Sequence, residues 1–140
     1  MSGTMNDTQL EKLEFSGDAP GPVFTVLGAV HGNEKCGTKA IGRIVQAIEQ
    51  GKIKLLKGRL CMIPICNPRA YEQDVRFTER NLNRFMYPKD DPKLYEDYLD
   101  NQLCPVLEAT DFLLDLHSYT SQGGAFIFPG KLDKETVHYV

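Results

Sequence analysis

The stretch that most constrains this fold is an almost unbroken apolar run from Val23 to Val30, which a turn and a helical pattern follow directly. An apolar run of this length suits a strand buried on both faces, as in a parallel sheet. Apolar residues recur at helical spacing in 35–50 and 92–109, and further apolar strands are predicted at 59–65, 111–116 and 125–128. Strands that alternate with helices predict an α/β fold, with an open, mostly parallel sheet flanked by helices.

The remaining segments are less regular. An edge strand is expected at 10–15 and a loop at 16–22, Gly51 suits the end of the first helix, and Pro105 should kink or split the second. Residues 67–91 show no clear period, yet their four aromatic residues argue against disorder. A long irregular segment inside a compact domain is usually functional or disordered. We therefore expect 67–91 to carry function.

Composition limits the class of protein. The chain has 140 residues, of which 41% are hydrophobic and 25% charged, with a net charge of −3, which fits one globular domain. There is no long Lys/Arg run and no apolar stretch of about 20 residues, so neither nucleic acid nor a membrane is expected as a partner. The polar start, 1–9, should be disordered and lacks the pattern of a signal peptide. The four cysteines show no CxxC pair, so we expect a reduced, cytoplasmic location.

Three side chains at predicted strand ends could hold one metal ion. His31 and Glu34 lie three residues apart where the first buried strand gives way to a helix, and His117 ends the strand at 111–116. If the two strands are parallel neighbours, the three side chains converge at the sheet edge where α/β folds bind ligands. Two His and one Glu are a ligand set of catalytic zinc. Each histidine alone could be an ordinary polar residue, but the three matched positions favour one zinc per chain.

Two nearby residues could add to this site. Asp115 lies two residues before His117, on the same side of a strand, and could accept the non-ligating N–H of that ring; a simple buried polar group is the alternative. Cys36 could supply a thiolate, although a small apolar filler is the commoner role of a free cysteine. His138 lies in a polar context and is expected at the surface. Another first-row divalent ion stays an alternative to zinc.

Arginine recurs every four residues at 76, 80 and 84, with Asn83 beside the last. On a helix these side chains would form one cationic stripe, which is ordinarily a solvated face. The aromatic residues and proline that follow are unusual for plain surface. Guanidinium groups bind carboxylates with two parallel hydrogen bonds, and an arginine beside a metal can stabilise an oxyanion.

Several motifs occur together in a fixed order. They are Gly32-Asn33-Glu34 after His31, Asn67-Pro68-Arg69, Arg76 with Asn83-Arg84, and Asp115-Leu116-His117. In this order and at these separations, the chain resembles the succinylglutamate desuccinylase/aspartoacylase family, relatives of the zinc carboxypeptidases. The resemblance covers about residues 23–128.

The resemblance implies a fold, an activity and a set of roles. It implies a zinc-carboxypeptidase-like α/β fold and an enzyme that hydrolyses the amide of a small N-acyl amino acid. It implies that His31, Glu34 and His117 hold zinc and that Arg76 contacts the scissile carbonyl. Asn83 and Arg84 would grip a carboxylate of the substrate.

The chain departs from the family in two ways. Asn81 stands where the family commonly has Asp, which should alter a supporting hydrogen bond. Family members also run well past residue 140, with a glutamate that acts as general base and a small β-rich domain that closes over the site. The last stretch here, a helix expected at 131–140, contains Glu135, whose surroundings do not match that base. We therefore interpret residues 1–140 as the N-terminal portion of a zinc hydrolase domain, with a natural short form as the alternative.

Three other functions stay open at this level. A carboxypeptidase would use the same zinc and arginine residues on peptides. A non-catalytic zinc-binding module would need no base, and a structural α/β domain would need no metal but would leave the order of the motifs unexplained.

Overall fold

The computed structural model describes residues 8–119 and 121–128. In this part the elements follow in the order β1 (Leu13–Ser16), β2 (Ala19–Leu27), α1 (Cys36–Glu49), β3 (Lys57–Ile63), α2 (Pro68–Glu72), α3 (Tyr95–Glu108) and β4 (Phe112–Asp115). The strands form a four-stranded sheet in the order β1-β3-β2-β4. β2 is parallel to β3 and β4, and β1 is antiparallel to β3. The predicted open, mostly parallel α/β sheet is confirmed.

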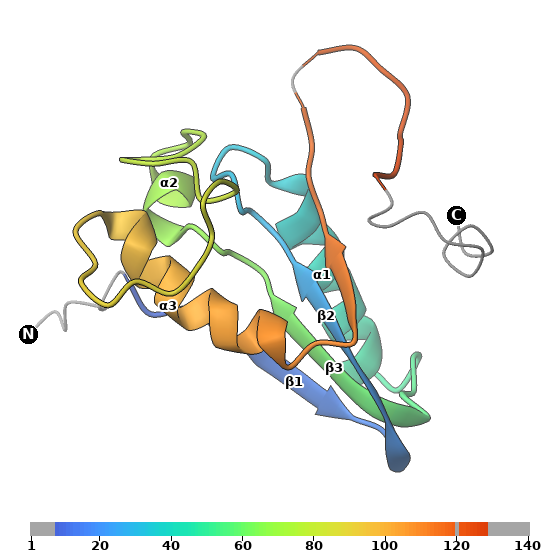
Figure 1. Cartoon of the computed structure of the whole chain (residues 1–140). Helices are drawn as coiled ribbons and strands as arrows, with labels where there is room; N and C mark the ends of the chain where they lie inside the picture. The colour runs from blue at the N-terminus through green and yellow to red at the C-terminus, as the bar shows by residue number, and fades with distance from the viewer. Residues whose placement is uncertain (1–7, 120, 129–140) are drawn as a thin grey trace, which may run out of the picture.

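Helices cover both faces of the sheet, α1 on one side and α3 on the other (Figure 1). Successive side chains of a strand point to opposite faces, so Val26 packs on the α1 side whereas Leu27 packs on the α3 side. The α1-side core is Val26, Ile41 and Met62. The larger α3-side core is Leu27, Val30, Ile63, Cys66, Leu82, Tyr95, Leu99 and Leu103. The buried run at 25–32 therefore fixes the loop after β2 between two packed layers.

Several predicted boundaries are wrong. β1 begins at Leu13, not at 10, and β3 spans Lys57–Ile63, not 59–65. β2 begins at Ala19, inside the expected loop, because the strand takes up its prolines at a register shift between Ala19 and Val23. Proline lacks a ladder donor and is tolerated at such irregularities. α3 begins at Tyr95, not 92, and continues through Pro105 without splitting.

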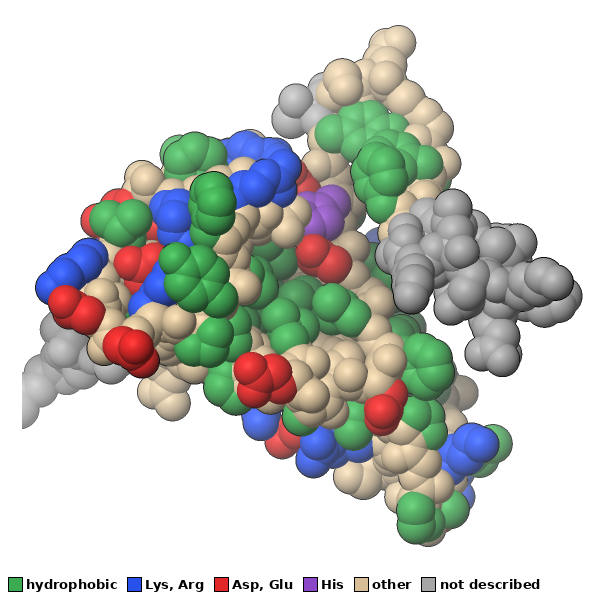
Figure 2. All heavy atoms as spheres, viewed as in Figure 1, with side chains coloured by type: hydrophobic (Ala, Val, Ile, Leu, Met, Phe, Trp, Pro, Cys, Tyr) green, Lys and Arg blue, Asp and Glu red, His purple; other side chains and the backbone are tan. Residues whose placement is uncertain are grey.

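The expected strand at 125–128 is also wrong, since these residues form no strand in the described structure. A strand needs a neighbour for its hydrogen bonds, and 121–128 runs away from the edge of β4 (Figure 1). Large apolar side chains stay exposed on this segment and on β4, with Phe112 60% exposed and Phe128 86%. Figure 2 shows hydrophobic side chains gathered over this side of the molecule. β4 is thus an edge strand with apolar faces that the described residues leave uncovered.

Some predictions fall outside the described residues. They are most of the disordered start at 1–9, the helix at 131–140 with Glu135, and the surface position of His138. Within the described part, no helix has the length and hydropathy needed to cross a membrane.

Candidate metal centre

The sheet brings the three predicted ligands together. His31 and Glu34 follow β2, His117 follows β4, and these strands are parallel neighbours with Leu27 opposite Asp115. Each of the three side chains offers one ligand atom, and these atoms all lie within 4.8 Å of one another. The predicted convergence of His31, Glu34 and His117 is therefore found in the structure.

The contacts inside this group are short. Nδ1 of His31 lies 2.9 Å from Oε1 of Glu34, and Nδ1 of His117 lies 2.9 Å from Oε2 of the same carboxylate. The two Nδ1 atoms are 3.2 Å apart. Glu34 also accepts a hydrogen bond from the backbone N–H of Ser118 at 3.0 Å. One carboxylate thus holds both rings, one from each strand end.

The far nitrogen of each ring has its own acceptor. Nε2 of His31 lies 3.0 Å from Oδ1 of Asn81, and Nε2 of His117 lies 2.7 Å from Oδ2 of Asp115. With each Nε2 donating to an oxygen, Nδ1 is the nitrogen that faces the centre, and a ring in its neutral form presents a lone pair there. Two imidazole lone pairs and a carboxylate then face one point. This donor set fits a zinc ion, which accepts nitrogen and oxygen ligands.

The three side chains titrate differently. Burial lowers the pKa of His31 below its ordinary value, against the opposing effect of Glu34. Burial works to raise the pKa of Glu34, but the N–H of Ser118 and both histidines outweigh it and hold that pKa below its usual range. The hydrogen bond that His117 donates to the carboxylate of Asp115 raises the pKa of His117. These shifts favour the deprotonated form that metal ligands need for Glu34 and His31, and they act against it for His117.

The loop at 28–34 is shaped by a close backbone approach. A Cβ on Gly32 would lie 2.1 Å from the carbonyl carbon of Ala70 in α2, so only glycine fits there. The N–H of Gly32 donates to the carbonyl of Arg76 at 3.2 Å. This bond ties the ligand loop to the start of the arginine segment. Ala29 adopts a positive φ of 46° where the chain leaves β2.

The three arginines do not form a stripe, because residues 76–84 are not helical. Nη1 of Arg76 lies 2.8 Å from Oε1 of Glu34, and half of that side chain is exposed beside the ligand group. Arg80 instead pairs with Asp97 and Asp100 of α3. Figure 2 shows a histidine at the surface next to Lys and Arg side chains.

Asn83 and Arg84 are exposed. Nη1 of Arg84 donates to the backbone carbonyl of Asn83 at 2.6 Å. Their side chains lie on the segment that carries Asn81, and the structure records no contact between them and the three ligands in the described residues. Cys36 is exposed and lies outside the ligand group, with Sγ 3.5 Å from the carbonyl of His117.

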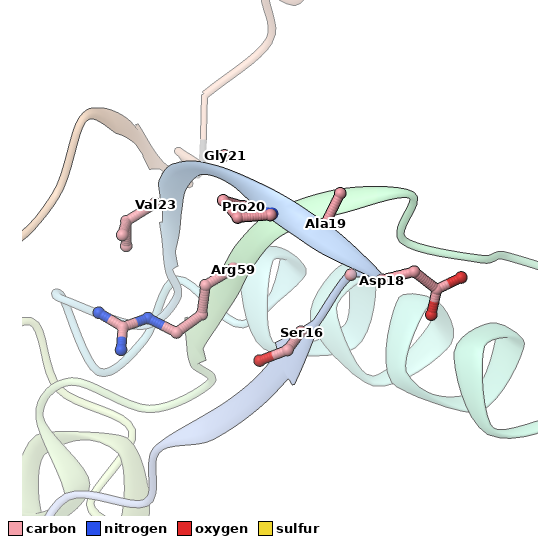
Figure 3. Close-up of a pocket in the computed structure, with 9 residues that line it drawn as sticks. Ser16, Asp18, Ala19, Pro20, Gly21, Val23 and Arg59 are labelled. Carbon is pink, nitrogen blue, oxygen red and sulfur yellow. The ribbon is translucent and has the colours of Figure 1, made fainter.

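A hollow lies near the start of β2, away from the ligands that follow the end of this strand. Figure 3 shows its lining of backbone and small side chains between Ser16 and Val23, together with Arg59. Its charged groups already have partners, since Asp18 pairs with Lys54 and Arg59 lies 3.9 Å from Glu14. This hollow offers no unpaired charge to a ligand.

Comparison with known proteins agrees with the geometry. The sequence pattern of the succinylglutamate desuccinylase/aspartoacylase catalytic domain matches residues 20–134. The chain belongs to this family. A probable aspartoacylase of Nostoc sp. is 29% identical over 120 residues, which are 77% of this chain and 39% of that protein.

Solved structures give the same result. An aspartoacylase family protein of Mesorhizobium loti matches with a TM-score of 0.68 at 29% identity, over 79% of this chain and 35% of that one. The succinylglutamate desuccinylase of Vibrio cholerae matches with a TM-score of 0.65 at 26% identity, over 76% and 34%. The chain therefore spans between a third and two fifths of the length of these relatives.

Sequence reasoning missed two contributors to the site. The N–H of Ser118 bonds Glu34 through the backbone, so its residue type gives no signal. Glu96 organises the arginine segment from within α3. Its acidic side chain among apolar helix positions was the only available signal.

Proposed function

We propose that this chain is the N-terminal part of a zinc-dependent enzyme that hydrolyses the amide bond of an N-acyl amino acid. The observation that carries the proposal is the convergence of His31, Glu34 and His117 within 4.8 Å, in a chain of the aspartoacylase/desuccinylase family. Zinc held by these three residues would act as a Lewis acid that polarises a carbonyl and lowers the pKa of bound water. The names of the family's enzymes indicate an N-acyl amino acid as the substrate. The acyl group and the amino acid stay open.

The chain's own residues then orient the substrate. Arg76 lies beside Glu34 with half of its side chain exposed, so its guanidinium can reach a carbonyl oxygen next to the ligand group. It would stabilise the charge that develops there when water attacks. Asn83 and Arg84, exposed on the same segment, would bind a carboxylate of the amino acid through N–H donors.

We further propose that full activity needs polypeptide equivalent to the part of the relatives that this chain does not match. Within the described ligand group the only carboxylate is Glu34, which is itself a ligand, so the base for water must come from elsewhere. Residues 8–119 and 121–128 leave the apolar faces of β4 uncovered, with Leu113 51% exposed. Both observations support a domain completed by further chain, in the cytoplasmic location that the cysteine usage favours.

Two measurements test the proposal. The first is the zinc content of the purified chain, where we expect about one zinc per chain and its loss in His117→Ala. The second is hydrolysis of N-acetyl and N-succinyl amino acids against a dipeptide series, by this chain and by any longer product of its coding sequence. Cleavage of N-acyl amino acids in preference to dipeptides supports the proposal. Cleavage of dipeptides alone indicates a carboxypeptidase, and bound zinc with no hydrolysis in either form indicates a non-catalytic zinc module.

A further inference from the structure

A buried carboxylate at the start of α3 binds the backbone of the irregular segment before it. Glu96 is 0% exposed. It accepts hydrogen bonds from the N–H of Thr78 at 2.9 Å, the hydroxyl of Thr78 at 2.8 Å and the N–H of Arg80 at 3.0 Å. The N–H of Glu79 and the side-chain amide of Asn67 donate as well, at 3.3 Å and 3.2 Å. One side chain thus accepts hydrogen bonds from three consecutive backbone N–H groups.

These donors make Glu96 a fixed anchor. Burial works to raise the pKa of Glu96, but the hydrogen bonds from Thr78, Asn67 and Arg80 outweigh it and hold that pKa below its ordinary value. A buried carboxylate is costly unless such donors surround it. Residues 78–80 belong to no helix or strand, so their N–H groups need a partner of this kind. The carboxylate therefore defines the backbone conformation of 78–80.

The next residue, Asn81, connects this segment to the metal ligands. Oδ1 of Asn81 accepts the N–H of Asn83 at 2.9 Å, which identifies this atom as the oxygen of the amide. Nε2 of His31, 3.0 Å from the same oxygen, must then be the donor. This leaves Nδ1 of His31 as the lone pair that faces Glu34 and His117.

We propose that Glu96 is a positioning residue for the metal centre, which fixes the backbone at 78–80 and so sets Asn81 against the ring of His31. The inference rests on the proposed metal site and adds a residue that is remote from it in the sequence. Arg80 and Leu82 flank Asn81 and are also anchored, the first by Asp100 and the second in the α3-side core. The rival explanation is that these two anchors alone hold Asn81.

The first test replaces Glu96 without changing its shape. Glu96→Gln puts an amide NH₂ where backbone N–H groups point and so disturbs 78–80. We expect Zn²⁺ binding to the purified chain, measured by competition with a chromogenic chelator, to weaken about tenfold. Ile48→Ala, in the last turn of α1 on the other face of the sheet, is the control for general loss of stability. An equal loss of zinc affinity in this control at a matched loss of stability would overturn the proposal.

A double-mutant cycle separates the proposed route from the rival one. Asn81→Leu removes the acceptor for His31 and should also weaken Zn²⁺ binding about tenfold. If Glu96 acts through Asn81, the double variant is no worse than either single one. An additive loss, about a hundredfold, would show that the two residues act separately and would overturn the proposal. Should Glu96→Gln not fold, Thr78→Val removes one donor to the same carboxylate and takes its place in the cycle.

A spectroscopic reading needs no metal. In the metal-free chain, ¹⁵N chemical shifts of the imidazoles should show His31 protonated at Nε2 in the wild type and as mixed tautomers in Glu96→Gln. An unchanged Nε2–H tautomer in the variant would contradict the proposal. If the wild type binds no zinc, the proposed metal centre fails, and this reading still decides the role of Glu96.

Discussion

Oδ2 of Asp115 lies 2.7 Å from Nε2 of His117, on the side of the ring opposite to Glu34. His31 has a neutral amide, Asn81, in the equivalent place. The two histidines of one candidate centre therefore have unequal support, since a carboxylate raises the basicity of a ring more than an amide does. The hydrogen bond that Asp115 accepts from His117 is also the main reason for the raised pKa of His117.

We expect Asp115→Asn to weaken zinc binding by about ten- to a hundredfold. The substitution keeps an acceptor oxygen beside His117 but removes its charge, so the ring becomes a poorer ligand without losing its place. The measurement is Zn²⁺ affinity by chelator competition. Asp18→Asn, just before the start of β2, is the matched control, because Asp18 pairs with exposed Lys54 and lies away from the ligand group. Equal affinities in wild type and Asp115→Asn would show that the carboxylate is only a packed polar group.

The glycine inside the ligand loop gives a second prediction. A Cβ at Gly32 would lie 2.1 Å from a backbone atom of Ala70, so Gly32→Ala should force the loop from α2 and cost about 3 kcal/mol of stability. Gly42→Ala is the matched control, because among the described residues no atom beyond the neighbouring helix backbone lies within 4 Å of that Cβ. In the interior of α1 it should instead stabilise by about 0.5–1 kcal/mol. Urea unfolding of the two variants, together with their zinc content, checks the expected loss of stability in Gly32→Ala and the expected gain in Gly42→Ala.

What the sequence could predict follows from how local each signal is. The apolar run at 23–30 predicts a buried strand by itself, and the helical spacing at 35–50 predicts a helix by itself. The structure has β2 and α1 in these regions. His117 could be placed beside His31 because neighbouring parallel strands end at one edge. These inferences need only the pattern of one segment and the rule for parallel sheets.

The misses depend on contacts between distant segments. The spacing of Arg76, Arg80 and Arg84 fits a helix, but Glu96 binds the backbone between them in another conformation. Glu96 lies at least 16 residues after the backbone N–H groups that it binds. The apolar residues at 125–128 indicate a strand, yet no described strand pairs with them. Periodicity carries no information about such partners.

The anchor at Glu96 also predicts a pH dependence of stability. Its pKa lies below 4.5 in the folded chain, and the unfolded chain should have the ordinary value of 4.5. The unfolded state then binds more protons between these values, so the stabilisation is present above pH 4.5 and is lost as pH falls through the folded pKa. Burial raises the pKa of Asp100 and acts in the opposite direction. The difference in stability between the wild type and Glu96→Gln, followed over pH, gives the contribution of Glu96 alone.

We therefore expect the stability of the wild type to fall more steeply with acid than that of Glu96→Gln. Urea unfolding at a series of pH values on either side of 4.5 measures both. Parallel curves for the two proteins would show that the carboxylate has the same pKa folded and unfolded.

Substrate binding should distinguish charge from geometry at Arg84. Arg84→Lys keeps the positive charge but loses the planar pair of donors, so an N-acyl amino acid should bind about tenfold more weakly, as a higher KM with little change in kcat. The measurement is steady-state hydrolysis in whichever product of the coding sequence is active. Arg43→Lys on α1 controls for the substitution itself. A KM equal to that of the wild type would remove Arg84 from the proposed carboxylate site.

Replacing Arg76 should affect kcat and not KM, the opposite of what we expect for Arg84. The guanidinium of Arg76 lies 2.8 Å from Glu34 and is half exposed beside the ligand group. In the proposed reaction, negative charge would develop there on a carbonyl oxygen. Arg76→Ala should lower kcat by about 10²–10³ with little change in KM, because the lost donor acts on the transition state. Zinc affinity should not fall, since Arg76 supplies no ligand atom and competes with the metal for Oε1 of Glu34. A loss of zinc in this variant would mean that Arg76 maintains the ligand geometry, and the fall in turnover would then say nothing about an oxyanion.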